Sequence, residues 1–220
     1  NLLQSFIKGE NMKRYYHLIF IIILALNLSC SQNKINTNRI FMREIPKYSN
    51  GEVELFYKLA GQKGKQLGLE NLDNGFDGVQ IRLWYDYSLT IKRELLVLIK
   101  SDSRWTAAYF DFTVDWNYKK QTETIKKVIK KELSPKSGWV SFISELYQLK
   151  IDTLPNMVDI PGLSLGTDGI TYNIEYADKD KYRFYGYHLP ELHQNKAWQA
   201  KNMVAILKLV EKEFGIQTRF

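Results

Sequence analysis

The sequence predicts an α+β domain, built from an antiparallel sheet of about five to six strands packed by two amphipathic helices. Two observations predict this class: runs of alternating apolar and polar residues come in two groups, and each group is followed by a segment with apolar residues at helical spacing. The composition agrees, because 220 residues with 45% hydrophobic and 25% charged side chains are typical of one globular domain with appendages. A body of this size buries enough surface to fold unaided. We therefore expect no cofactor.

The first group of strands begins at Val79, where residues 79–88 alternate between apolar and polar side chains. This period of two predicts a half-buried strand. Two further strands are expected over about residues 92–100 and 105–116, separated by the turn at residues 101–103. The simplest pairing of these strands is an antiparallel meander.

Residues 118–134 fit two structures. The positions of Ile125, Ile129 and Leu133 suit one face of a helix, whereas the β-branched content and the stop at Ser134-Pro135 suit an edge strand. Both remain open, and we favour the strand.

The second group contains two helices and a hairpin. A helix is expected after the candidate cap Ser137, with apolar residues at helical spacing up to Leu149. After a long loop, residues 170–176 alternate again, and the aromatic run 182–187 returns as their hairpin partner. A final helix is expected over about residues 196–214.

The N-terminal region has the order of a secretory signal. Lys13 and Arg14 precede nine apolar residues, Leu18 to Leu26, and a lone cysteine, Cys30, follows. This run is too short to span a bilayer, which needs about 20 residues to cross roughly 30 Å of hydrocarbon. The sequence therefore divides into residues 1–29 as upstream residues and signal peptide, 30–51 as a tether and 52–220 as a single α+β domain.

Residues Asn27-Leu28-Ser29-Cys30 resemble the lipobox of bacterial lipoproteins. The resemblance implies that Cys30 becomes the acylated N-terminus of the mature protein, anchored in the cell envelope. Ser31 is not the aspartate associated with inner-membrane retention, so the resemblance favours the outer membrane. The stretches Ser134–Trp139 and Thr167–Tyr172 are similar to exported bacterial proteins of no assigned activity and imply no function.

The net charge of the chain limits the classes of partner that it can attract. The formal net charge of +7 falls to +5 without residues 1–29, which hold three basic residues and one acidic residue. Such an excess favours loose association with anionic lipid or polymer, and export argues against nucleic acid. The expected partners are a membrane, through the N-terminal lipid, and an anionic envelope polymer or a protein.

Weak catalytic candidates lie in the loop after Pro161. Gly162-Leu163-Ser164-Leu165-Gly166 matches the nucleophile pattern of α/β-hydrolases, with Asp168 and His188 following in the required chain order. The pattern needs a strand before the serine and a helix after it, and the sequence predicts neither. An acidic pair drawn from Asp111, Asp115 and Glu175 is a second hydrolytic option.

Two groups of residues contain the side chains of a metal site, and we expect neither to bind a metal. Asp73, Gly75, Asp77 and Gly78 resemble half of a calcium loop, but Trp84 stands where the bidentate glutamate is required. His188, Glu191 and His193 lack the spacing of a zinc-binding helix, and Pro190 interrupts any helix there.

The remaining candidates are binding residues. The lysines of the 118–134 stretch could contact an anionic surface, and Trp84 could stack against a carbohydrate. The candidate lysines are Lys126, Lys127, Lys130 and Lys131. We therefore expect an envelope lipoprotein with a non-enzymatic binding domain, and the alternative is an envelope hydrolase that uses Ser164 or an acidic pair.

Overall fold

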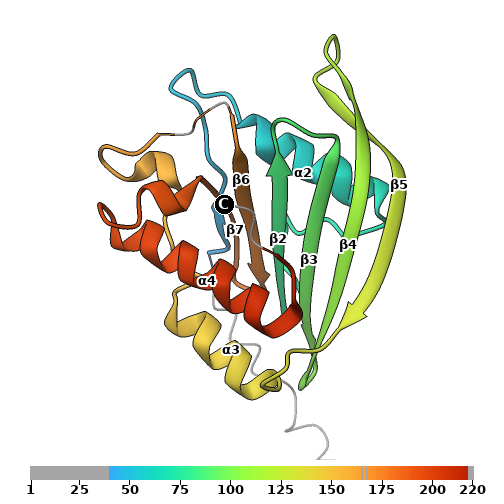
Figure 1. The fold of residues 1–220 in the computed structure, drawn as a ribbon, viewed down its shortest axis with the longest axis vertical. Coiled ribbons are helices and arrows are strands. Elements are labelled where there is room, and N and C mark those ends of the chain that lie inside the picture. The colour runs from blue at the N-terminus through green and yellow to red at the C-terminus, as the bar shows by residue number, and fades with distance from the viewer. Residues whose placement is uncertain (1–39, 165, 167, 218–220) are drawn as a thin grey trace, which may run out of the picture. The chain divides into compact units, whose positions relative to one another are not determined.

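The computed structural model describes residues 40–164, 166 and 168–217. Their core is one mixed sheet of seven strands in the order β1-β7-β6-β2-β3-β4-β5 (Figure 1). The strands are β1 Met42–Glu44, β2 Val79–Tyr87, β3 Lys92–Ser101, β4 Arg104–Asn117, β5 Thr122–Leu133, β6 Ile170–Asp178 and β7 Lys181–His188. The helices are α2 Leu55–Gln66, α3 Trp139–Gln148 and α4 Trp198–Phe214, with short 3₁₀ turns at Met157–Asp159 and Pro190–Leu192.

Helices cover both faces of the sheet. The side chains of α3 and α4 pack into one core with Leu83 of β2, whereas Ala60 of α2 packs into a second core with Trp84, the next residue of the same strand. Successive residues of a strand point to opposite faces, so the two cores lie on opposite sides of one sheet. This arrangement confirms the α+β class.

The expected sheet had too few strands, and its pairing was expected to be purely antiparallel. The observed sheet has seven strands, and it is mixed because β1 pairs in parallel with β7. The structure also has three helices where two were expected. The added strand, β1, lies within the segment expected to be a tether. It carries no alternating pattern and is held by its pairing and by an ion pair between Glu44 and Arg183.

The expected strands and hairpins are otherwise confirmed. Strands β2 to β5 form an antiparallel meander, and β6 pairs with β7 as a hairpin. Residues 122–133 form the edge strand β5, which settles the ambiguous stretch as a strand. The residue before α3 is Gly138, and no side chain caps that helix, so Ser137 does not have the capping role expected of it.

Strand β2 differs from expectation in its burial. The alternating pattern predicted one face in water, but the polar residues are buried as well, including Gln80, Arg82 and Asp86. The reason is α2, which covers the face where those side chains point. Burying a polar group is costly unless it is hydrogen-bonded, and most polar atoms of these residues are paired in two networks beneath α2.

Candidate functional site

A pocket of about 310 Å³ lies between α2 and the sheet. The side chains of Arg82, Glu175 and Tyr182, from three adjacent strands, form its floor. Its walls come from α2 and from the loop that follows that helix. The wall residues are Tyr57, Lys58, Gly61, Gly64, Lys65, Leu69, Glu70, Asn71, Leu72 and Asp73.

Arg82 is almost fully buried in this floor, and its Nε is unpartnered. Its Nη1 lies 3.4 Å from Oε2 of Glu175, and its Nη2 donates to the backbone oxygen of Glu70 and to Oε1 of Gln80 at 2.9 Å. A buried N–H without a partner is costly.

The carboxylate of Glu175 is fully engaged. It accepts hydrogen bonds from the indole N–H of Trp84 at 2.8 Å and from the hydroxyl of Tyr182 at 3.0 Å, in addition to its ion pair with Arg82. Burial, and then the charge of Glu175, raises the pKa of Tyr182, so its phenol stays protonated and donates. Glu175 therefore holds the floor in place and is not free to act as a base.

Two glycines open the helical wall. Gly61 and Gly64 are three residues apart in α2 and share a face with Tyr57. A Cβ at Gly61 would meet nothing within 4 Å, and one at Gly64 would lie 3.7 Å from Nη1 of Arg82. Each glycine in a helix costs about 1 kcal/mol relative to alanine. The helix thus gives up stability at the two positions where a side chain would occupy the pocket or its edge.

Asp73 also lines the pocket. Its carboxylate accepts hydrogen bonds from Arg43 Nη2 at 2.7 Å and from the hydroxyl of Tyr57 at 2.8 Å. Asp73 is therefore paired, and it is not a free ligand for calcium.

The glycines of the expected half calcium loop have a structural role. Gly75 and Gly78 both have positive φ, and an added Cβ would lie 2.7 Å and 2.1 Å from the backbone oxygens of Asp178 and Lys100. Only glycine fits this close approach. Over the described part of the chain, no three His, Cys, Asp or Glu side chains are grouped to hold a metal ion.

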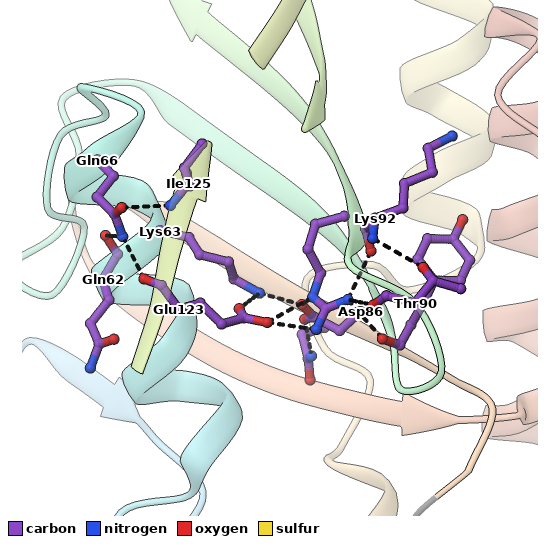
Figure 2. A network of polar contacts seen from close by, with 11 residues as sticks. Gln62, Lys63, Gln66, Asp86, Thr90, Lys92, Glu123 and Ile125 are labelled. Carbon is purple, nitrogen blue, oxygen red and sulfur yellow. Dashed lines mark hydrogen bonds and ion pairs between the residues drawn. The ribbon is translucent and has the colours of Figure 1, made fainter. Parts of the chain in front are cut away.

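A second polar network lies beneath α2 (Figure 2). Lys63 of α2, fully buried, forms ion pairs with Asp86 and with Glu123, the latter at 3.3 Å. Arg93 binds the other oxygen of Glu123 at 2.6 Å, and Asn173 donates to Asp86 at 2.9 Å. Two cations thus balance two carboxylates, which makes this network a link between α2 and the sheet.

The hydrolase candidates do not assemble. Nδ1 of His188 lies 3.0 Å from Oγ1 of Thr171, and a Cβ on Gly166 would approach its Nε2 to 2.5 Å. Ser164 and Asp168 are exposed, and no hydrogen bond joins Ser164 to His188. Burial lowers the pKa of His188, although a hydrogen bond with the backbone of Asp168 opposes this. The imidazole is therefore part of the packing below the loop.

The acidic pair does not assemble either. Glu175 is on β6 and the two aspartates are on β4, with β2 and β3 between these strands. Three strand spacings are about 14 Å, beyond the roughly 6.5–9.5 Å that separates inverting glycosidase carboxylates. Asp111 and Asp115 are instead paired with Lys92 and Lys126.

Trp84 is fully buried, so it cannot stack against a ligand from the outside. Its ring packs under Lys63, whose Nζ lies 5.2 Å from the ring centroid, and its indole N–H is used by Glu175. The expectation failed because α2, which covers this face, was not predicted.

The candidate lysines lie along β5, the last strand of the sheet, and are exposed. Lys126 pairs with Asp115 at 2.9 Å, and Nζ of Lys130 lies 5.7 Å from the ring centroid of Phe110. Lys127 and Lys131 point into solvent with no partner among the described residues. Lysines on an edge strand discourage pairing with other sheets, so their position also has a structural explanation.

Comparisons with protein-family models, with curated proteins and with solved structures found no match to this chain. Within the described residues, no helix has the length and hydropathy needed to cross a bilayer. The segment expected to be a signal peptide, and Cys30, lie outside the described residues.

Proposed function

We propose that this chain is a lipid-anchored protein of the bacterial envelope whose domain binds a small polar ligand in the pocket between α2 and the sheet. The observation that carries the proposal is the buried Nε–H of Arg82, which has no partner in the pocket floor. Buried polar groups in proteins are generally paired, and a binding pocket holds a few placed polar groups. Seven other buried side-chain atoms of the described residues also lack a hydrogen-bond partner, but Arg82 is the residue among them that lines this pocket.

The chemistry of the pocket limits the ligand. An arginine N–H can only donate, so the ligand must present an acceptor oxygen to Arg82. Lys58 and Lys65 add positive charge to the wall, and Glu70 adds one carboxylate. The volume of about 310 Å³ is at the small end of the range for ligand sites. A small carboxylic acid or a sugar fits these conditions.

The pocket supports binding rather than turnover. Two carboxylates of the pocket are held by protein partners: Glu175 by three donors, and Asp73 by Arg43 and Tyr57. A general base or a nucleophile must be free to reach the substrate, and these two carboxylates are not. Binding needs only the unpartnered donor of Arg82, so binding is the function that we propose for the pocket.

The anchoring part of the proposal rests on the N-terminal sequence. A basic pair, a short apolar run and the lipobox-like end at Cys30 favour acylation and attachment to the envelope, with the outer membrane as the favoured site. The exposed lysines of β5 are the residues that we propose for contact with an anionic envelope polymer or a protein.

The binding proposal is tested with the full chain and a library of small carboxylic acids, amino acids and sugars. We expect at least one compound to raise the melting temperature in a concentration-dependent way, because a ligand that binds only the folded state stabilises it. Gly61→Phe should fill the pocket and abolish the shift. Arg82→Lys, which cannot reproduce the planar donor, should weaken binding.

Gly61→Ala is the matched control. It has space for its methyl group and should retain ligand binding while stabilising the free protein by about 0.5–1 kcal/mol. Equal ligand shifts in the wild type and Gly61→Phe, or no shift with any compound, would refute the pocket as a binding site.

A further inference from the structure

The ends of two hairpins lie at the same end of the sheet and are exposed. The turn between β2 and β3 presents Leu89 and Ile91, which are 79% and 63% exposed, and the turn between β4 and β5 presents Tyr118, which is 80% exposed. The backbone N–H of Val114 donates to the oxygen of Ile91 at 2.9 Å and joins the β2–β3 turn to strand β4. Figure 1 shows the β4–β5 hairpin projecting beyond the other strands at this end. We call residues 114–125 the arm.

The arm combines aromatic and basic side chains. The ring of Trp116 lies edge-on against that of Tyr118, with centroids 6.2 Å apart. Lys119 and Lys120 follow in the exposed turn, and Lys126 and Lys127 continue the basic stretch along β5.

The arm has no uncompensated acidic group. Its two acids are Asp115, paired with Lys126, and Glu123, buried against Lys63 and Arg93. The exposed turn of the arm therefore carries the positive charge of Lys119 and Lys120, at the same end of the sheet as the exposed Leu89 and Ile91.

We propose that this end of the sheet docks on an anionic phospholipid bilayer. Tyrosine and tryptophan prefer the boundary between headgroups and hydrocarbon, and lysines next to them bind anionic headgroups. Leu89 and Ile91 favour a bilayer over a soluble polyanion, because only a bilayer removes their side chains from water. The proposal is independent of the pocket and of acylation at Cys30.

The test uses the full chain with Cys30→Ala, so that no acyl chain contributes, and measures flotation with vesicles. For each variant, partition into phosphatidylcholine vesicles that contain phosphatidylglycerol is divided by partition into vesicles without it. All variants carry the same N-terminal segment, so its contribution does not differ between them. A lysine near an anionic surface changes partition about fivefold. Lys119→Gln with Lys120→Gln should therefore lower the ratio at least about tenfold, and Leu89→Ser with Ile91→Ser should lower partition into the anionic vesicles.

The matched controls lie on other elements. Lys201→Gln with Lys208→Gln removes two exposed lysines from α4, and Val140→Ser removes a valine of α3 that is 88% exposed. Neither should change partition. Trypsin cleavage at Lys119 and Lys120 should be slowed by anionic vesicles, whereas cleavage at Lys201 and Lys208 should not.

Three results would overturn the proposal. The first is a partition ratio that the arm variants leave at the wild-type value. The second is binding to soluble polyphosphate that depends on Lys119 and Lys120 but not on Leu89 and Ile91, which would make the arm a polyanion site. The third is a dimer in sedimentation velocity that the arm variants dissociate, which would make the surface a contact with a second copy of the chain.

Discussion

Glu54 is buried just before α2, and its Oε2 accepts no hydrogen bond from the described residues. Burial, and then the charge of Asp159, raises the pKa of Glu54 to about 7. Because the folded-state pKa is above the unfolded value, the protein is most stable where Glu54 is protonated in both states. That stability is lost as the pH rises from about 4.5 through about 7.

Glu54→Gln mimics the protonated side chain and should remove this pH dependence. We expect little change in the free energy of unfolding near pH 4.5 and a stabilisation of roughly 3 kcal/mol above pH 7, at 1.36 kcal/mol for each pKa unit. Urea unfolding at a series of pH values measures the difference. A variant whose stability runs parallel to that of the wild type at every pH would show that Glu54 is not the group responsible.

Single residues show why the site was not predicted. Arg82 is one of the polar residues in the alternating pattern of strand β2. Such a pattern is typical of a strand with one face in water. Periodicity specifies which side chains share a face and not what covers that face. The pattern therefore predicts a solvent-facing side chain for Arg82 and an open surface for Trp84, although both are buried beneath α2.

At the scale of elements, α2 is held to the sheet by the buried ion pairs of Lys63. Lys63→Met should destabilise the protein by about 3–5 kcal/mol, because Asp86 and Glu123 lose a buried counter-charge. Chemical unfolding measures this loss. Adding Asp86→Asn should recover part of it, because one uncompensated carboxylate is removed.

Lys126→Met is the matched control on an exposed pair. Lys126 and Asp115 are both more than half exposed, so the loss should stay below about 1 kcal/mol. If Lys63→Met cost no more than Lys126→Met, the buried network would not be what fixes α2.

The elements that were predicted correctly have strong local patterns. Strands β2, β3, β4, β6 and β7 alternate or are rich in aromatic and β-branched residues, and α4 has a clear apolar stripe. Helix α2 has the opposite character: it contains Gly61 and Gly64, buries Lys63 and begins without a side-chain cap. Tertiary contacts stabilise it where local propensity does not, and β1 is likewise formed only by its partner β7.

For the whole molecule, the proposed anchor predicts a chemical modification. Cells that express the chain with a labelled fatty acid should incorporate the label, and Cys30→Ser should abolish it, because Cys30 is the one cysteine of the sequence. Mass spectrometry of the mature N-terminus should find acylated Cys30. An intact leader, or a free thiol at Cys30, would contradict the anchor and leave the binding pocket unaffected.

The central claim is that the free Nε–H of Arg82 receives a ligand, and NMR of the arginine side chains tests it most directly. The Nε–H signals are assigned by loss in Arg82→Lys and Arg93→Lys, and the chain is titrated with the compound that stabilises it most. The signal of Arg82 should shift, whereas that of Arg93, whose Nε already donates to Glu123 at 2.9 Å, should stay in place. An unmoved Arg82 signal at saturating compound would contradict the claim.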